Sequence, residues 1–555
     1  MIGGSQHEIR NAAPISPRAA DDSACYRYLR GTAHLDPLLL ENVQFDDRKE
    51  AVLRSTKFRK VGSGPGEFVE VLGSNTTTEA RNSNSSAPLL ETLPPADVDF
   101  LVQSFFDVVH PVFPILDQHA FRVSYASRSV EPLLFAAVCV VSGAWLSATH
   151  HLPKEVDLSN TEIMLWEHLR ASLERPNITT LQAGLLLLQC PSYTSQQLFS
   201  QLISVGFDLG VHRDCSDWQI SPRETSSRKR LAWALYAQDK WTALLHGRPA
   251  QMTEANWMVR DLSDDDFDLF TGKDDKSSSL HRHGALLFMQ MLILSQLLAE
   301  VLATFYTLSA EDEVRASAHN GLRVVLARAK SVQIKLKDWF SSLPAELKMN
   351  ARDESQVACN GILHLSYFAT EIALHRCIIR ASVAGGSDSH VTHICRSAAK
   401  TRLISAMDFV NRLRPSHFKS SWPLTSVSNF GLIGSFGVLL SATAPTTEEA
   451  GFYRARLEEY RWTLSVSSRN ADFLDSAIHL LDSSTELLQH VPEKPEIAEF
   501  VATNPQVLEG DGHTSDAARS AFHVAQERLS EAFEGFSSPA TSSSSEHEAE
   551  ANESA

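Results

Sequence analysis

Apolar residues recur at spacings of three and four along the middle of the chain, which is the period of an amphipathic helix. In ADVDFLVQSFFDVVHPVF, starting at residue 96, the apolar stripe consists of Val98, Leu101, Val102, Phe105, Phe106 and Val109. Pro111 ends this predicted helix, because proline cannot continue the hydrogen-bond ladder. The same period returns in TTLQAGLLLLQC (179–190), LFSQLISVGFDLGVH (198–212), RKRLAWALYAQDKWTALLHG (228–247), ILHLSYFATEIALHRCIIRAS (362–382) and DFLDSAIHLLDSSTELLQH (472–490).

Alternating strand patterns bounded by Asn-Gly or Asp-Gly are missing from this region, and no repeat of fixed period is present. The pattern therefore predicts an all-α fold, an irregular multi-helix domain over residues 96–490.

The two flanks of this domain differ from it in composition. Residues 1–95 are polar and end in SNTTTEARNSNSSAP, and residues 505–555 form an acidic Ser/Glu-rich tail. Such segments cannot bury a core, so we expect a largely irregular N-terminal segment and disorder at both ends. One stretch of the tail, AFHVAQERLSEAFEGF (521–536), places aromatic residues on one helical face; it fits a helix that docks into a coactivator groove and equally a final helix that packs on the domain.

Two long apolar runs are expected to be core helices and not membrane spans. PLLFAAVCVVSGAWLSA (132–148) is too short to cross a bilayer and is broken by Ser142 and Gly143. GALLFMQMLILSQLLAEVLATFYTL (284–308) is long enough but contains Glu300, which is costly in lipid. The second run suits a dimer interface, between two copies or with another protein, as readily as a core.

The charge balance argues against binding of nucleic acid through the overall charge of the protein. The chain has 67 acidic and 50 basic residues, a formal net charge of -17, and a hydrophobic fraction of 43% that suits a globular protein. Basic residues gather in DDRKEAVLRSTKFRK (46–60), which fits an import signal, a weak phosphate-binding stretch or a solvated segment. A second cluster, Arg228-Lys229-Arg230, is expected on the solvent-exposed face of its helix. Neither supplies contacts to base edges.

The cysteines give no structural zinc site. All seven are spread singly, without a CxxC pair, and several lie in apolar runs that predict reduced, buried thiols. An odd number in a long chain fits a reducing compartment, and the N-terminus MIGGSQHEIRNAAP has no apolar segment of a secretory signal.

Candidate catalytic patterns are all incomplete. Asp264-Asp265-Asp266-Phe267-Asp268 satisfies the DDxxD pattern with which all-α terpene synthases chelate magnesium, but it lies in a loop-like stretch and no second magnesium motif follows. His212-Arg213-Asp214 spells the start of a kinase catalytic loop without the other kinase motifs. The glycine-rich GSGPGEF (62–68) lacks phosphate-loop spacing. The sequence therefore predicts no enzyme, no cofactor and no catalytic, cofactor-binding or metal-ligating residue; the alternative is an all-α magnesium-dependent prenyl diphosphate enzyme using Asp264–Asp268.

From about residue 97 to 270 the chain resembles the fungal-specific transcription factor domain, the regulatory region of fungal zinc binuclear cluster regulators. FFDVVHPVFPILDQHAF (105–121), PLLFAAVCVVSGAW (132–145) and TTLQAGLLLLQC (179–190) are similar to its successive helices, and the densest match is residues 202–252. The motif residues are Gln182, Gly210, His212, Arg213, Arg230, Trp233, Tyr236, Asp239, Gly247, Arg248 and Pro249. YRYLRGTAHLDPLLL (26–40) and ANWMVRDLSDDDFD (255–268) resemble a subgroup linked to nitrogen-source regulation.

These motif residues are expected to be structural. Gly210 and Gly247 suit left-handed turns at helix ends, Pro249 prevents further helix, and Trp233 and Tyr236 should share a packed face. Arg248 should bond helix-end carbonyls or a neighbouring acid.

The chain departs from the family pattern at its N-terminal side. Family members usually carry six closely spaced cysteines there, whereas only Cys25 precedes residue 139 in this sequence. The resemblance implies a nuclear transcription regulator that works through other transcription regulators or coactivators, as monomer, homodimer or heterodimer, with DNA bound indirectly or weakly. A partner-dependent coregulator, a shortened gene product and a fragment stay open.

Overall fold

The protein is seen here in a computed structural model. The structure describes residues 25–29, 40–41, 43–53, 56–62, 67–72, 94–149, 151–153, 156–190, 196–267, 276–317, 320–349, 354–383 and 389–498. The tail over 505–555 and its stretch 521–536 lie outside the described residues, as does most of 1–95.

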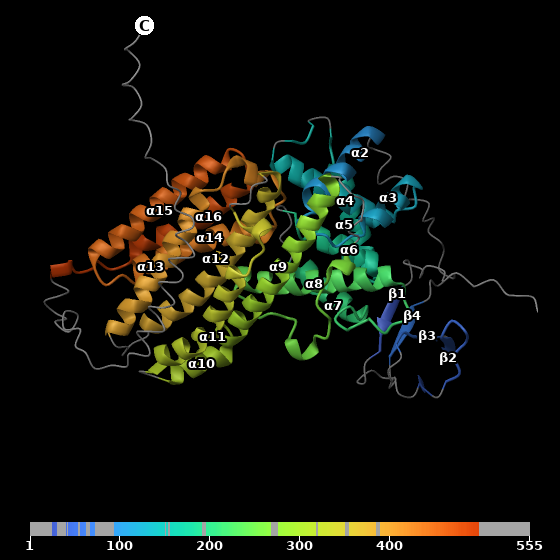
Figure 1. The fold of residues 1–555 in the computed structure, drawn as a ribbon, viewed down its shortest axis with the longest axis horizontal. Helices are drawn as coiled ribbons and strands as arrows, with labels where there is room; N and C mark the ends of the chain where they lie inside the picture. Colours follow the sequence, from blue (N-terminus) through green and yellow to red (C-terminus); the bar gives the residue numbers. More distant parts are fainter. Residues whose placement is uncertain are drawn as a thin grey trace, which may run out of the picture.

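Helices build almost the whole of the described chain (Figure 1). Up to residue 267 they are α2 (Pro95–Ser104), the π-helical turn η3 (Phe105–Val109), α3 (Gln118–Ala126), α4 (Pro132–Ala148), α5 (Ser159–Ser172), α6 (Ile178–Leu187), α7 (Gln196–Asp208), α8 (Pro222–His246) and the short 3-10 turns η4 (Glu254–Asn256) and η5 (Asp264–Asp266). After it they are α9 (Lys276–Phe305), α10 (Leu308–Ala316), α11 (Gly321–Ser341), η7 (Ala345–Leu347), α12 (Glu354–Val383), α13 (Ser389–Asn411), η8 (Pro415–Lys419), α14 (Leu424–Ala442), α15 (Thr447–Ser468), α16 (Phe473–Glu486) and η9 (Leu487–His490). The predicted fold class, an irregular all-α multi-helix domain, is confirmed.

Helix ends fall where the sequence supplies caps. The side chain of Glu131 accepts from the backbone N–H of Leu134 at the start of α4, and Asn177 and Thr180 form a reciprocal capping box at the start of α6. These bonds satisfy backbone donors that a helix N-terminus leaves unpaired. Both helices then bury nearly continuous apolar sequence against each other.

Both apolar runs singled out in the sequence are helical: 132–148 is α4, and 284–308 lies mostly in α9. Two helical stretches among the described residues, Ser279–Phe305 and Leu424–Ala442, are long and apolar enough to cross a bilayer, and 50% and 72% of their most apolar windows are buried within the protein. The first belongs to α9, which packs on α8, α11 and α12; the second is α14, which packs on α12, α15 and α16.

A small antiparallel sheet lies at one end of the molecule beside α7 and α8 (Figure 1). Its strands, in the order β1-β4-β3-β2, are β1 (Cys25–Tyr28), β2 (Glu50–Leu53), β3 (Thr56–Lys60) and β4 (Phe68–Leu72). These strands are a difference from the largely irregular segment predicted for residues 1–95. They are four or five residues long and rich in charge, so the alternation in TKFRK, with Phe58 buried between Lys57 and Arg59, is too short to stand out.

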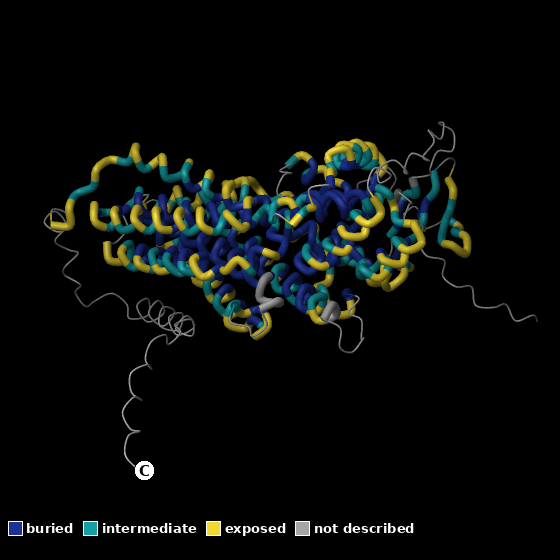
Figure 2. The backbone as a smooth tube through the Cα atoms, turned by 90° about the horizontal axis from the view of Figure 1, so that it is seen from above, coloured by how far each residue is buried: buried dark blue, intermediate teal, exposed yellow. Residues whose placement is uncertain are grey.

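One continuous apolar core runs through the helical body from α2 to α16. Figure 2 shows this buried interior extending along the long axis of the molecule. Two small clusters lie at the sheet, and one of them, Tyr28, Val61, Val69, Cys215 and Trp218, joins the sheet to the segment after α7. The sheet is thereby fixed to the helical body and not only tethered to it.

Candidate functional site

Helix α8, which carries the densest motif match, has strong signals at both ends. The side chain of Ser221 accepts from the N–H of Glu224, and Pro222 occupies the first turn. At the other end Gly247 has φ of 60°, the left-handed conformation that glycine adopts without a Cβ clash. Pro249 follows two residues later, so the chain must leave the helix direction here.

The basic cluster Arg228-Lys229-Arg230 points into the protein. The prediction that it lies on the solvent-exposed face is wrong: Arg228 and Arg230 are 4% and 3% exposed. Arg228 bonds Glu224 at 3.0 Å and the carbonyl of Leu209 at 3.0 Å. A surface position was the natural expectation for three charges in a row, but each of the three has an acceptor brought by another part of the chain or by the previous helical turn.

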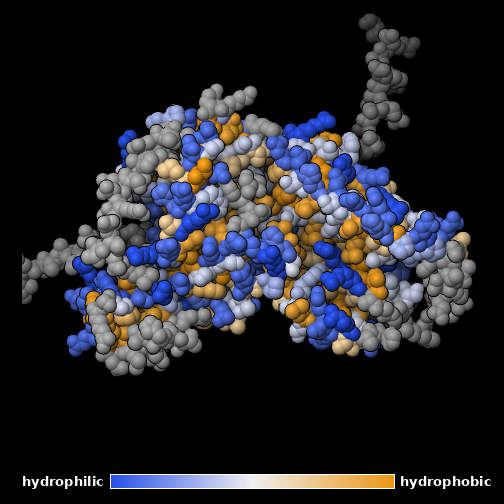
Figure 3. Space-filling model, turned by 180° about the vertical axis from the view of Figure 1, so that it is seen from behind, coloured by the Kyte–Doolittle hydropathy of each residue, from blue (hydrophilic) through white to orange (hydrophobic). Residues whose placement is uncertain are grey.

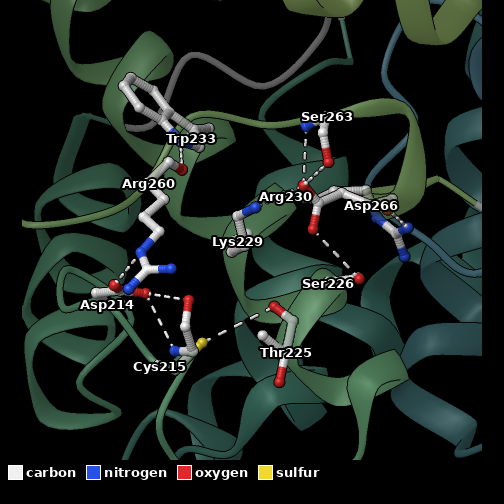
Figure 4. A network of polar contacts seen from close by, with 11 residues as sticks. Asp214, Cys215, Thr225, Ser226, Lys229, Arg230, Trp233, Arg260, Ser263 and Asp266 are labelled. Carbon is white, nitrogen blue, oxygen red and sulfur yellow. Dashed lines mark hydrogen bonds and ion pairs between the residues drawn. The ribbon is translucent and has the colours of Figure 1, made fainter.

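The acidic run after α8 supplies two of those acceptors. Lys229 Nζ lies 2.5 Å from Asp266 Oδ2, and Arg230 donates to the backbone carbonyl of Asp266. The Asp266 carboxylate also accepts from Ser226 Oγ at 3.3 Å and from the N–H and Oγ of Ser263 at 2.9 and 3.2 Å. Figure 4 shows Asp266 between Ser226 of α8 on one side and Ser263 on the other. Its oxygens are therefore committed to protein donors.

The remaining acids of the DDxxD pattern do not join Asp266. Asp264 and Asp265 are exposed in the 3-10 turn η5, and Asp268 lies outside the described residues. Across the described residues no group of three or more His, Cys, Asp or Glu side chains could hold a metal ion. Among the described acids of this run, Asp266 alone anchors the loop to α8 through its carboxylate.

Two aromatic motif residues hold the same loop. Trp233 Nε1 donates to the carbonyl of Arg260 at 2.9 Å, and the Tyr236 hydroxyl donates to Glu254 Oε1 at 2.5 Å. Their rings are 5.4 Å apart, and both pack on Trp257, which comes from the loop. Burial, together with the Glu254 carboxylate, raises the pKa of Tyr236, so this hydroxyl stays a donor at neutral pH.

Asp239 fixes the turn that brings the loop back. It is 1% exposed and accepts from the backbone N–H groups of Gln251 at 2.9 Å and Met252 at 3.0 Å. Lys240 Nζ lies 3.0 Å from the Asp239 carboxylate and also donates to the carbonyl of Met252. A buried carboxylate that accepts two backbone bonds and faces an ammonium group is a stable arrangement.

Together these contacts define a strap, residues 251–267, that runs antiparallel along one face of α8. The helix residues that hold the strap are spaced three or four apart, as one face requires: Ser226, Lys229, Trp233, Tyr236 and Lys240. Arg230, Trp233, Tyr236 and Asp239 were predicted from the sequence as motif residues. Lys229 was expected on the solvent-exposed face, and Lys240, Glu254 and Arg260 were not singled out. Two lysines on the same helical stripe as two aromatic residues were the signal that could have revealed them.

The His212-Arg213-Asp214 segment joins three parts of the structure. His212 is buried edge-on against Phe207 of α7. Arg213 pairs with Glu67 at 3.3 Å and lies over the Tyr28 ring, both from the sheet region. Asp214 pairs with Arg260 of the strap at 2.7 Å. Gly210, with φ of 68°, makes the left-handed turn that sends the chain from α7 into this segment.

Two motif residues lie outside the network. Gln182 is half-buried in α6, and the side chain of Arg248 is exposed beyond the end of α8. Among the described residues neither side chain makes a hydrogen bond, and only the backbone N–H of Arg248 reaches a helix-end carbonyl, that of Ala243. The predicted side-chain role of Arg248 is therefore not seen.

The described thiols are not poised for chemistry. Cys139, Cys190, Cys215, Cys359 and Cys395 are buried and unoxidised, and Cys377 is half-buried. Burial raises the pKa of Cys139 to about 12 and that of Cys215 to about 11, which keeps both as neutral thiols.

Comparison with known proteins identifies the class of domain. Residues 102–343 match the model of the fungal specific transcription factor domain, so the resemblance seen over 97–270 is confirmed and reaches further into the chain. The strap and the α8 network lie inside the matched range. Residues 102–343 thus have the sequence pattern of a fungal specific transcription factor domain.

Individual relatives agree with that assignment. The transcriptional activator protein DAL81 of Saccharomyces cerevisiae is 31% identical over 488 residues, which is 80% of this chain and 50% of that protein. An uncharacterized transcriptional regulatory protein of Schizosaccharomyces pombe is 30% identical over 221 residues, 38% of this chain and 32% of the relative. An acetamidase regulatory protein of Aspergillus fumigatus is 26% identical over 324 residues, 56% and 39% of the two chains. The chain thus spans half or less of the length of these relatives.

Proposed function

We propose that this chain is a nuclear regulator of transcription that acts through protein contacts of its helical domain. The observation that carries the proposal is the domain match together with 31% identity to a transcriptional activator over 80% of the chain. We expect its partners to be other transcription regulators or coactivators. The same contacts would allow the chain to form a homodimer or a heterodimer.

The pairing of the basic residues favours protein contacts over direct DNA binding. In the hairpin of β2 and β3, Glu50 pairs with Lys57 at 2.6 Å and also with Arg59, and Lys60 pairs with Glu41 at 2.7 Å. DNA phosphates would have to displace these carboxylates, and the net charge of -17 opposes their approach. The buried cluster 228–230 cannot reach a phosphate at all.

Exposed apolar side chains offer surfaces for a partner. Trp462 is 68% exposed on α15, and Val466, one turn further along the same helix, is 40% exposed. Figure 3 shows apolar side chains between hydrophilic ones on one whole face of the body. Exposed tryptophan is a frequent anchor of protein interfaces because it buries a large area with little conformational freedom to lose.

The enzyme alternative receives no support from the geometry or the relatives. Asp266 anchors the strap, Asp264 and Asp265 face solvent, and the relatives described above are transcription regulators by name.

A tethered reporter assay tests the proposal. The chain is fused to an unrelated DNA-binding module in a fungal cell, and transcription is measured against the module alone. We expect the fusion to change transcription, Trp462→Ala to weaken the effect several-fold, and Glu458→Ala, an exposed substitution one turn away, to leave it intact. A nuclear, folded fusion that leaves the reporter at the level of the module alone would contradict the proposal.

A further inference from the structure

A cavity of about 60 Å³ lies where the helices before and after the strap meet. Its walls come from α8, α9, α12, the start of α14 and the turn after η3, with Phe113, Trp241, Met291, Leu292 and Ile362 among the apolar lining residues. This volume is several times the roughly 10–15 Å³ that one water requires, so it holds a ligand of a few non-hydrogen atoms.

The chemistry of the lining restricts what can enter. All side chains that line the cavity are apolar or neutral, and its polar members are two glutamines, the Trp241 indole and Thr425. An ionised ligand would lose its hydration without gaining a counter-charge, which costs far more than burying a neutral group. The ligand must therefore be uncharged and mostly apolar.

One polar atom in the lining accepts no hydrogen bond among the described residues. Gln189 is 4% exposed, and its amide nitrogen donates to the Leu185 carbonyl at 3.4 Å and to Gln238 Oε1 at 3.2 Å. The Leu185 carbonyl can only accept, which identifies the nitrogen, so the other amide atom is Oε1. Within the described residues, Oε1 of Gln189 accepts no hydrogen bond. This oxygen is therefore available to accept a hydrogen bond from a ligand that carries a donor.

The other polar groups leave Gln189 as the recognition point. The Trp241 indole N–H already donates to Ser295 Oγ at 2.9 Å, and Gln238 Nε2 donates to Thr242 at 3.2 Å. Neither of these groups turns its donor to the cavity. The hydroxyl of the half-buried Thr425 can donate or accept, so Oε1 of Gln189 is the polar atom that specifically favours a ligand with a donor.

Helix α8 lies between this cavity and the strap. The α8 residues that line the cavity, Ala234, Ala237, Gln238 and Trp241, form a second stripe with helical spacing, distinct from the stripe that holds the strap. A ligand would thus add contacts between α8 and the helices α9, α12 and α14.

We propose that this cavity binds a small uncharged ligand with an apolar body and one hydrogen-bond donor, which is directed at Oε1 of Gln189. The inference does not rest on the role in transcription, because binding is measured on the purified chain. Its failure would leave the tethered reporter result untouched.

Butan-1-ol and its isomer methyl propyl ether are suitable probes, since they have the same atoms and only the alcohol has a donor. Butyrate is the charged counterpart. The full chain is labelled at the methionine methyl carbons; it has 8 methionines, and Met291 lines the cavity whereas Met164 on α5 does not. We expect butan-1-ol to shift the Met291 methyl signal saturably, the ether to bind about five-fold more weakly, and butyrate to leave it unchanged.

Two variants separate the site from the fold. Ala237→Leu should fill the cavity and abolish the Met291 shift, and Gln189→Leu should reduce butan-1-ol to the affinity of the ether while leaving the ether unchanged. The far-ultraviolet circular dichroism of each variant checks that it is folded. Equal binding of butyrate, an unaltered alcohol preference in Gln189→Leu, or no saturable shift of Met291 in the wild-type chain would overturn the proposal.

Discussion

At the scale of single residues, the charges buried along α8 each meet a group that offsets their loss of water. Lys229 faces Asp266, and Lys240 faces Asp239, which in turn accepts two backbone bonds from the strap. Burying an ammonium or carboxylate group without such a partner costs several kcal/mol. Residues that look catalytic in the sequence therefore have a structural use.

Asp266→Ala should remove about 3–5 kcal/mol from the free energy of unfolding, because it leaves the Lys229 ammonium group without its carboxylate at a site that is 11% exposed. Asp265→Ala, one residue away and exposed, should change it by less than about 0.5 kcal/mol. Guanidinium unfolding of both variants gives the comparison. Equal losses would show that the strap is not anchored as described.

Buried histidines make the protein sensitive to acid. Burial lowers the pKa of His110 and His375 to about 3 and that of His364 to about 4. Because the unfolded chain binds protons at pH values where these folded histidines do not, stability is present above the unfolded pKa of about 6.5 and is lost as pH falls below it.

Each of these histidines should contribute a loss of up to about 1.4 kcal/mol per pH unit between about pH 6 and 5. Unfolding of the wild-type chain and of His375→Phe, measured at several pH values, tests this: the variant should show a slope smaller by about one proton in that window. Between pH 7 and 8 the two slopes should agree. The same slope in both proteins below pH 6 would contradict the neutral state of His375.

At the scale of elements, the strap packs along one face of α8, and the turn at the C-terminus of α8 sets the direction in which the strap runs. Gly247 adopts φ of 60°, and a Cβ added there would meet nothing within 4 Å. A substitution at this position therefore reports the backbone preference alone.

Gly247→Ala should destabilise the chain by about 1 kcal/mol, since alanine pays for the left-handed conformation. Gly451→Ala, exposed inside α15 and equally unobstructed, should stabilise it by about 0.5–1 kcal/mol, because alanine favours the helix. Thermal or denaturant unfolding should give opposite signs for this identical substitution. The same sign at both positions would be inconsistent with the α8 turn.

At the scale of the whole molecule, one apolar core joins helices from both sides of the strap. Leu101 of α2 and Leu481 of α16 belong to the same continuous cluster of buried side chains. A shared core makes partial unfolding costly, because opening one half would expose the apolar face of the other.

We expect the helical body to unfold as one cooperative unit. Native-state hydrogen exchange in increasing denaturant should give backbone amides of α4 and α14 the same opening free energy and the same denaturant dependence. A lower opening free energy for the amides of α4 than for those of α14 would show that the body unfolds as two units.

The sequence predicted what depends on local period and missed what depends on distant pairing. The stripe from Val98 to Val109 and the glycines at 210 and 247 are readable because a helix face and a left-handed turn are local properties. The sheet pairs Cys25 with Leu72, which are nearly fifty residues apart in the sequence. Strands of four or five residues carry no local pattern that predicts such a pairing. The inward orientation of Lys229 and Arg230 depends on a strap whose return along α8 only the fold reveals, and that of Arg228 depends on the distant Leu209 carbonyl.

The central claim, regulation through protein contacts and not through a grip on DNA, is tested most directly by the binding of the purified chain to mixed genomic DNA fragments at moderate salt, with and without zinc. We expect no complex below about 10⁻⁶ M in either condition, because Lys57, Lys60 and Lys229 of the two basic clusters are already paired with carboxylates. Tight binding that weakens steeply as salt is raised would contradict it.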